Sequence, residues 1–527
     1  MRPVRDLCIL VGALLLSCCA PRSGRPVSFP TYDPFVSLQG DPGNALAGSA
    51  ESSAPVGPAT PSGPTPTRAP ISVRLPSTST SLNSSSPTPD SPHAVATIRA
   101  APAQHFVQPG ETLGMIARQY GLSLAQLQSA NGITDPNILD VGMLLVVPPP
   151  DPTGVGPSRK IIPDSELVYG PASAIFDTRD FVWARGGYLA AYMEEVGDEV
   201  LRGDEIVTRI ARNYSVNPRL LLAIIEHSSG WLTEASARPM DYPLGWQDPY
   251  RMGLYLQLGW AADTLNRGYY LWKANAISAW VLADGTAVPI EPTINAGTAA
   301  LQHYFAQLHP RDAWEAQLQP TGFSKTYEEL FGDPFDLAVE PLVPAGLRPP
   351  DLQLPFEFGD TWSFTGGPHG GWDTGSAWAA LDFGPPGDTA SCAASTTWIA
   401  AIADGLVIRS EHGAVLQDLD NDGFEGTGWV VLYMHVDSGE RVRAGTYLYG
   451  GQRVGHASCE GGLSNGTHVH IARRYNGEWI PADGVLPFTL DGWVSGGNGI
   501  EYDGWLRRGG QVVEAWDGVN PANQIGR

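Results

Sequence analysis

The 527-residue sequence has few charged residues and few cysteines, and each shortage excludes a class of protein. Charged side chains make up 17% of the chain, with 32 Lys and Arg against 55 Asp and Glu, for a net charge of −23. Nucleic-acid binding needs clustered cations that contact phosphates, so this balance argues against that function. Five cysteines are also too few for a small fold stapled by disulfides.

Other patterns are missing as well. No glycine-rich loop follows a strand pattern, as phosphate binding requires, and no Ser-His-Asp set or cysteine-nucleophile context is present. Beyond the N-terminus, no run of 18 apolar residues predicts a transmembrane helix. What the chain does have is length for three or four domains, and 61 Gly and 46 Pro that predict linkers and β-turns.

The N-terminus has the pattern of a targeting segment. Two arginines precede an apolar run, Leu7 to Leu16, that is too short to span a bilayer comfortably. The run leads into Ser17-Cys18, and the whole resembles a bacterial lipobox. The resemblance implies a signal peptide over residues 1–18, a lipid on Cys18 and an extracytoplasmic location at a membrane surface. Ordinary cleavage near Ala20 is the alternative.

Residues 19–103 are rich in Pro, Ser and Thr and have few bulky side chains. Such a segment buries too little apolar surface to offset the loss of chain entropy. The composition therefore predicts a disordered linker between the N-terminus and the first folded domain.

Residues 104–149 have the pattern of a small βααβ unit. The whole unit resembles the LysM domain, a family that binds N-acetylglucosamine-containing glycans in peptidoglycan or chitin. The resemblance assigns glycan binding to Asn131, Asp135 and Asn137, and it makes peptidoglycan the expected partner. A LysM fold with a degenerate groove is the alternative.

Residues 160–343 have helical periodicity, and we expect an all-α domain there. The expected helices cover residues 188–200, 205–214, 218–227, 250–266 and 296–308. The region resembles the lysozyme-like core of lytic transglycosylases, in which a Glu-Ser pair supplies the general acid. Ser228-Ser229 stands at that position, so the resemblance implies a fold without its acid. Activity through Glu226 or Glu234, or an unrelated helical domain, are the alternatives.

The last third of the chain has short β patterns separated by Gly and Asp, which predicts an antiparallel all-β domain over residues 350–495. An extension over residues 496–527 follows, to which the sequence assigns no role. In the run His468-Val469-His470, the two histidines share one face because side chains alternate along a strand. Two imidazoles on one face suit zinc, with one as a ligand and one free for proton transfer.

The runs Gly466 to His470, Tyr433-Met434-His435 and Arg453-Val454-Gly455 resemble the lysostaphin-type (LytM-like) zinc endopeptidases of peptidoglycan. The resemblance implies one zinc ion per chain, with His369 and His470 as ligands. It assigns catalytic roles to His435 and His468. A degenerate relative that keeps the fold but binds no metal is the alternative.

The third zinc ligand is expected to be a carboxylate, and two candidates compete. Asp373 keeps the His-x-x-x-Asp spacing of the family. Asp382 lies on a better strand pattern and precedes Phe383-Gly384, as the ligand of the family does. We favour Asp382 and interpret the residues around Asp373 as part of an inserted loop.

Two further features concern stability and metal binding. Cys392 and Cys459 are the two cysteines that follow residue 19, and export favours a disulfide between them over two buried thiols. Such a bond stabilises by roughly 4 kcal/mol in the chain-entropy model. Asp418, Asp420 and Asp422 match the first half of a calcium-binding loop, but the twelfth position is Trp429. A plain acidic turn is therefore favoured over calcium binding.

The sequence thus predicts a multidomain, cell-envelope zinc metalloendopeptidase that hydrolyses peptide bonds of peptidoglycan and is targeted by glycan binding. The alternative is a noncatalytic peptidoglycan-binding envelope protein, or an activator of another hydrolase, with a degenerate peptidase fold. Zinc content separates the two predictions.

Overall fold

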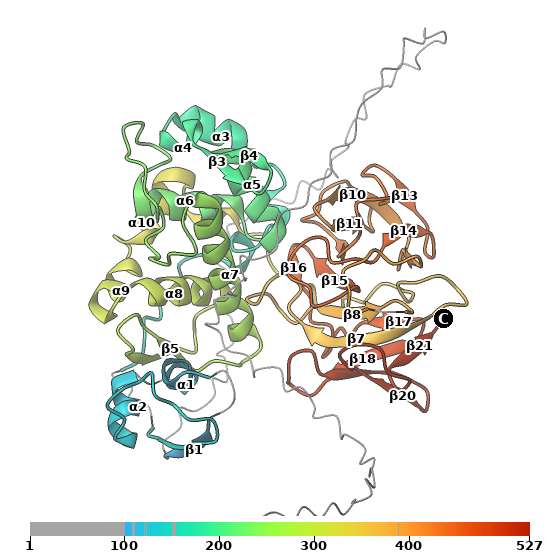
Figure 1. The fold of residues 1–527 in the computed structure, drawn as a ribbon. Helices are drawn as coiled ribbons and strands as arrows, with labels where there is room; N and C mark the ends of the chain where they lie inside the picture. The colour runs from blue at the N-terminus through green and yellow to red at the C-terminus, as the bar shows by residue number, and fades with distance from the viewer. Residues whose placement is uncertain (1–100, 108–110, 121, 123, 150–153, 388) are drawn as a thin grey trace, which may run out of the picture.

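The computed structural model describes residues 101–107, 111–120, 122, 124–149, 154–387 and 389–527 (Figure 1). The predicted signal peptide, Cys18 and residues 19–100 of the predicted linker lie outside this range. Within the described range, no helix combines the length and the apolar character needed to cross a membrane.

The first folded unit is the predicted βααβ unit. Its elements are β1 (Ala103–Phe106), α1 (Leu113–Gln119), α2 (Leu124–Asn131) and β2 (Leu144–Val147). The two strands pair antiparallel, and β1 begins at Ala103, inside the segment predicted to be a linker. The helices pack on the strands through a small core of its own, which includes Leu113, Leu127 and Leu145.

The middle region is mostly helical (Figure 1). Its helices are α3 (Thr178–Arg185), α4 (Tyr188–Ala191), α5 (Gly203–Tyr214), α6 (Pro218–Ser229), α7 (Leu254–Lys273), α8 (Ala296–Leu308), α9 (Arg311–Gln317) and α10 (Phe323–Phe331). Three short 3₁₀ helices are η1 (Asp164–Glu166), η2 (Pro171–Ser173) and η3 (Pro334–Leu337). Two hairpins are β3 (Met193–Val196) with β4 (Glu199–Arg202), and β5 (Ala279–Val281) with β6 (Ala287–Pro289).

Local signals explain where these helices begin and end. Asn217 caps α6 by accepting a hydrogen bond from the Arg219 amide, and Pro218 occupies the first helical position. Gly230, with a φ of 67°, ends the helix in the left-handed conformation. The helix predicted over residues 188–200 is wrong. Gly197, with a φ of 64°, instead supports a tight turn between β3 and β4.

The C-terminal half is built on a nine-stranded antiparallel sheet. The strand order is β13-β10-β11-β12-β15-β8-β7-β21, and β16 pairs with β15. Its strands are β7 (Thr361–His369), β8 (Ala380–Gly384), β10 (Gly405–Glu411), β11 (Ala414–Asp418), β12 (Trp429–Met434), β13 (Tyr447–Leu448), β15 (Val469–Tyr475), β16 (Glu478–Trp479) and β21 (Gln524–Gly526). A separate pair joins β9 (Trp398–Ala400) to β14 (Arg453–His456).

The last residues of the chain are integrated into this half. A four-stranded sheet contains β17 (Thr489–Leu490), β18 (Trp493–Gly497), β19 (Gly504–Arg508) and β20 (Gln511–Glu514). The expected boundary between residues 495 and 496 cuts through β18. Because β21 also pairs with β7, residues 496–527 are part of the β domain rather than an appendage.

The helical region packs against one face of the nine-stranded sheet. Leu416, Leu432 and Trp479 of the sheet share one apolar cluster with the helices, whereas Val415, Val431 and Tyr433 point into a second cluster on the opposite face. This alternation follows from the period of two along a strand.

Buried charges cross the same interface. Glu425 accepts hydrogen bonds from Arg409 at 3.1 Å and Arg474 at 2.9 Å, and it also pairs with Arg212 of α5. A buried carboxylate of this kind is stable only when paired. The helical region and the β domain therefore share one interface, which contains both packed apolar side chains and paired charges.

Candidate metal centre

Three donor atoms from the centre of the nine-stranded sheet converge. His369 ends β7, Asp382 lies in β8, and His470 lies in β15 directly opposite Asp382. His369 Nε2 lies 3.0 Å from His470 Nδ1 and 3.2 Å from Asp382 Oδ1, and His470 Nδ1 lies 3.3 Å from Asp382 Oδ1. The sequence predicted these three residues as the metal ligands, and the fold brings them together.

The outer nitrogens of the two imidazoles fix which nitrogen faces inward. His369 Nδ1 lies 2.8 Å from the Gly367 carbonyl oxygen, and His470 Nε2 lies 3.2 Å from the Gly371 carbonyl oxygen. A carbonyl only accepts, so these nitrogens carry the protons when the rings are neutral. His369 Nε2 and His470 Nδ1 then present two lone pairs to each other, an arrangement that suits a cation between them.

The donor set fits zinc. Ligand atoms 2.0–2.2 Å from a tetrahedral zinc ion lie about 3.3 to 3.5 Å apart, close to the three distances of this site. Asp382 Oδ1 is buried and has no hydrogen-bond partner among the described residues. A buried oxygen without a partner is unfavourable, and a bound metal ion would satisfy it. All three side chains are buried, and two imidazoles with one carboxylate leave one tetrahedral position for water.

The electrostatics of the site keep the aspartate ionised. Burial alone would raise the pKa of the Asp382 carboxyl, but His369 and His468 hold it well below its usual range. Burial lowers the pKa of His470, whereas the attraction of Asp382 outweighs burial and raises the pKa of His369. An ionised carboxylate beside imidazole nitrogens is the state that binds a divalent cation.

The other two predicted histidines lie on the open side of the donor set. His468 Nε2 lies 3.8 Å from Asp382 Oδ2, and the rings of His435 and His468 are 4.5 Å apart. His435 Nδ1 contacts the Glu460 carbonyl at 3.2 Å, and His468 Nδ1 contacts the Gly466 carbonyl at 2.8 Å. Each ring therefore keeps its Nε2 for other partners. Burial, with the charges of His468 and His470, lowers the pKa of His435 to about 3.

Asp373, the rival ligand candidate, lines the same cavity but is not among the three converging donors. Its Oδ2 accepts a hydrogen bond of 3.0 Å from the Tyr214 hydroxyl at the end of α5. The neighbouring Gly375 amide donates to Asp263 of α7 at 2.6 Å, and Arg267 donates to Thr374 at 2.6 Å. The loop of residues 370–376 is thus held by the helical region. It also carries the Gly371 carbonyl that contacts His470.

Sequence reasoning missed two residues beside the site, Glu501 and Tyr502. The Tyr502 ring stacks on His369 with a 4.2 Å centroid separation, and burial raises the pKa of Glu501. The Gly367 amide donates to the Tyr502 carbonyl at 2.8 Å, which ties the β18–β19 turn to β7. No motif marks this turn, and only the return of the chain to β7 places it at the site.

These groups open into one large cavity of about 1240 Å³. The β domain supplies the histidines, Asp382 and Tyr502. The helical region supplies the opposite wall, from the β3–β4 turn, Arg209 and Tyr255. Glu199, which begins β4 after this turn, pairs with Arg209 of α5 at 2.7 Å and lies 3.7 Å from His412 of the β domain.

The remaining sequence candidates have other surroundings. The Asn131 side chain bonds the Leu127 and Val146 carbonyls and the Val146 amide, so it joins α2 to β2 inside its domain. Asp135 accepts from the Asn137 amide at 2.9 Å in an exposed turn. These contacts leave Asp135 and Asn137 as the exposed members of the predicted glycan-binding set.

The candidate acids of the helical region are engaged structurally or lie away from the cavity lining. Glu226 accepts hydrogen bonds from the Leu232 and Thr233 amides at 2.9 and 3.1 Å, and so holds the turn after α6. Neither it nor Glu234 lines the large cavity.

The three aspartates of the predicted calcium loop offer oxygens within 4.8 Å of one another. However, the Asp418 carboxylate already accepts from the Asp420, Asn421 and Gly423 amides. Trp429, at the twelfth loop position, lies in β12. These contacts are those of a satisfied acidic turn.

The fold and the donor set define a zinc metallopeptidase, and comparisons with known proteins agree. Residues 105–148 match the LysM domain, and residues 160–343 match the LasA N-terminal domain. The protease LasA of Pseudomonas aeruginosa is 27% identical over 364 residues, covering 66% of this chain and 80% of the relative.

Two further proteins are similar to the β domain. The β-lytic metalloendopeptidase of Lysobacter enzymogenes is 25% identical over 154 residues, covering 29% of this chain and 83% of the relative. Among solved structures, the M23 metalloprotease pseudoalterin has 22% identity and a TM-score of 0.26. That match covers 33% of this chain and 99% of the other. The match to LasA also extends through the middle region, for which the sequence predicted a transglycosylase-like domain.

Proposed function

We propose that this protein hydrolyses peptide bonds of peptidoglycan as a zinc endopeptidase, and that His369, Asp382 and His470 hold the metal. The observation that carries the proposal is the triangle of buried donor atoms with two inward-facing imidazole lone pairs. Similarity to the protease LasA and to a metalloendopeptidase supports the reaction class. The LysM match supports peptidoglycan as the partner.

The roles of the side chains follow from their free atoms. A zinc ion bound there supplies Lewis acidity toward a peptide carbonyl and acidifies a water molecule. His435 and His468 each donate Nδ1–H to a backbone carbonyl, which leaves Nε2 toward the cavity. Because its Nδ1 is engaged with the Glu460 carbonyl, the Nε2 of His435 is the nitrogen that can accept a proton from the attacking water.

The second histidine completes the proton path. His468 Nε2 lies beside Asp382, on the same side of the cavity as His435. A protonated ring there donates to the oxyanion or to the amine that leaves when the peptide C–N bond breaks. The cavity between the two halves of the molecule, about 1240 Å³, has room for a peptide substrate beside these groups.

Targeting and location follow from the N-terminal third. Binding through Asp135 and Asn137 would raise the local concentration of cell wall at the peptidase, so modest glycan affinity is enough. A lipid on Cys18 would restrict the enzyme to a membrane surface in the cell envelope. Calcium binding at the 418–423 turn and a transglycosylase-like origin of the helical region stay predictions from the sequence.

The direct test is cleavage of purified peptidoglycan by the full chain, read as new amino groups and by mass spectrometry of the fragments. We expect cleavage that stops on chelation, returns with zinc and is absent in His470→Ala. His309→Gln is the matched control, because His309 follows α8 in the helical region outside the cavity lining. Fragments that carry anhydro-sugar ends and survive in His470→Ala would instead assign the activity to glycan cleavage.

A further inference from the structure

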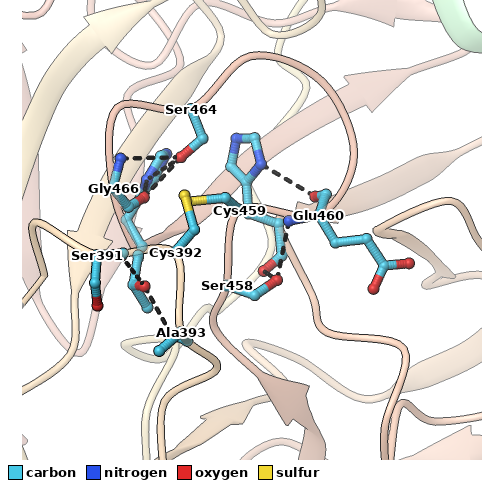
Figure 2. Close-up of a disulfide and its surroundings, with 11 residues drawn as sticks. Ser391, Cys392, Ala393, Ser458, Cys459, Glu460, Ser464 and Gly466 are labelled. Carbon is cyan, nitrogen blue, oxygen red and sulfur yellow. Dashed lines mark hydrogen bonds between the residues drawn. A yellow bond between two sulfur atoms is a disulfide. The ribbon is translucent and has the colours of Figure 1, made fainter. Parts of the chain in front are cut away.

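We infer that the Cys392–Cys459 disulfide positions His435 and His468, so that reducing it slows turnover while the zinc ligands stay in place. The inference rests on the proposed function, because it concerns the two non-ligand histidines of that site. The structure joins the two cysteines across 67 residues of sequence. Figure 2 shows the bond between the segment of residues 391–393 and the segment of residues 458–460.

The residues on both sides of Cys459 hold His435. The Ser458 amide and hydroxyl both donate to the His435 carbonyl, at 2.7 and 3.0 Å. The Glu460 carbonyl accepts the proton of His435 Nδ1 at 3.2 Å. Cys459 therefore lies between the two residues that set the backbone position and the ring tautomer of His435.

The residues on both sides of Cys392 hold the backbone before His468. The Thr467 hydroxyl contacts the Ser391 carbonyl at 2.6 Å and the Ala393 carbonyl at 2.8 Å. The Thr467 amide also donates to the Ser391 carbonyl at 3.1 Å. A backbone bridge pairs Ser458 with His468, so the two cysteine segments meet at the second histidine.

Two further backbone hydrogen bonds join these stretches, from the Ser395 amide to the Ala457 carbonyl at 2.8 Å and from the Thr467 amide to the Thr389 carbonyl at 2.9 Å. The described residues 389–397 contain no helix or strand, and Cys392 is exposed. His435 has a φ of 63°, a left-handed conformation that is unfavourable for a residue with a side chain and persists only where the surroundings hold it. A covalent bond between the two segments supplies that restraint.

The zinc ligands do not depend on this restraint. They lie in or at the end of strands β7, β8 and β15, and their outer nitrogens contact Gly367 and Gly371. Loss of the disulfide should therefore separate the two functions of the site, with proton transfer impaired and metal binding kept.

The chemical step is a two-electron reduction. A trialkylphosphine attacks one sulfur and breaks the S–S bond. Water then supplies the oxygen of the phosphine oxide and the two protons of the new thiols. The exposure of Cys392 makes the bond accessible to such a reagent.

The experiment uses the full chain, untreated, phosphine-treated and as Cys392→Ser/Cys459→Ser, with peptidoglycan as substrate. We expect kcat to fall about 10- to 100-fold, with KM little changed and one zinc per chain retained. Removal of the phosphine and reoxidation in air should restore kcat in the wild type. Ile525→Ala, buried in the edge strand β21, is the control that lowers the melting temperature without contacting either cysteine segment.

Three outcomes would overturn the inference. One is an unchanged kcat in folded, reduced protein. Another is loss of zinc together with activity, which would make the disulfide a support of the ligands. The third is a loss of kcat in Ile525→Ala that equals the loss in the reduced protein when the two proteins have the same melting temperature. An untreated chain that binds no zinc would overturn the proposed function itself, which keeps the two failures distinguishable.

Discussion

The two sides of the cavity are built by different means. The ligand side consists of three adjacent strands of the nine-stranded sheet, β15, β8 and β7, where ladder hydrogen bonds fix the backbone that carries the ligands. The histidine-pair side, with His435 and His468, lies at strand ends and is held by loops and one disulfide. A rigid sheet suits metal coordination, which tolerates little displacement, whereas proton transfer depends on loops that can also admit substrate.

The largest expected effect separates the two aspartates on the ligand side. Asp382→Ala should weaken zinc binding so far that dialysis removes the metal, and lower kcat/KM by more than about 1000-fold, because it removes a ligand and leaves two buried imidazoles facing each other. Asp373→Ala should keep one zinc per chain. Metal analysis of both variants after dialysis makes the measurement, and loss of zinc only from Asp373→Ala would reverse the assignment.

The next largest effect concerns the histidine-pair side of the cavity. His435→Ala and His468→Ala should each lower kcat by about 100- to 1000-fold and keep zinc, because they remove a proton acceptor or donor but no ligand. Steady-state kinetics with zinc analysis on the same samples provides the check. A variant that loses its zinc would show that the two sides are not separable.

A third effect concerns how the helical region is fixed to the sheet. Burial would raise the pKa of Glu425, but Arg409, Arg474 and Arg212 lower it to about 2, from an ordinary 4.5. Its stabilisation is therefore fully present above about pH 4.5 and is lost as the pH falls toward 2, by about 3 kcal/mol. Urea unfolding between pH 5 and 2 should show this extra loss in the wild type relative to Glu425→Gln. Parallel pH profiles of the two proteins would contradict it.

The smallest effect tests whether the helical region supports the ligand side. Tyr214→Phe and Asp263→Ala release the loop that carries the Gly371 carbonyl, so zinc should bind about 10-fold more weakly in a chelator competition. Lys273→Met is the matched control. It removes a 2.5 Å ion pair to Glu478 at the same interface but leaves the loop untouched. Equal zinc affinity in the wild type and the three variants would show that the helical region lines the cavity but does not support the zinc ligands.

The same contrast explains what the sequence could predict. The strand period predicts that His468 and His470 share one face, whereas their expected roles came from the resemblance to lysostaphin-type endopeptidases. That resemblance, together with the strand pattern, also led to the choice of Asp382. The structural role of Asp373 could not be predicted, because its partner Tyr214 lies 159 residues earlier in the chain. Glu501 and Tyr502 were not predicted as site residues for the same reason. They reach the site only because the chain returns to β7 through β18 and β19.

Local signals also failed where a turn competed with a helix. The residues around Gly197 have acceptable helical spacing, but one glycine in the left-handed region converts them into the β3–β4 hairpin. The hairpin then forms a wall of the cavity, which periodicity alone does not indicate. Burial of Leu416 and Leu432 against the helices likewise depends on how two regions pack, not on either segment.

The most direct test of the account is X-ray absorption spectroscopy at the zinc edge on the full chain loaded with one equivalent of zinc. The account predicts two imidazole nitrogens and one or two oxygens at about 2 Å in wild type, with one imidazole fewer in His470→Ala. A wild-type spectrum with sulfur ligands, or with the same imidazole count in both proteins, would contradict the claim that His369, Asp382 and His470 hold the metal.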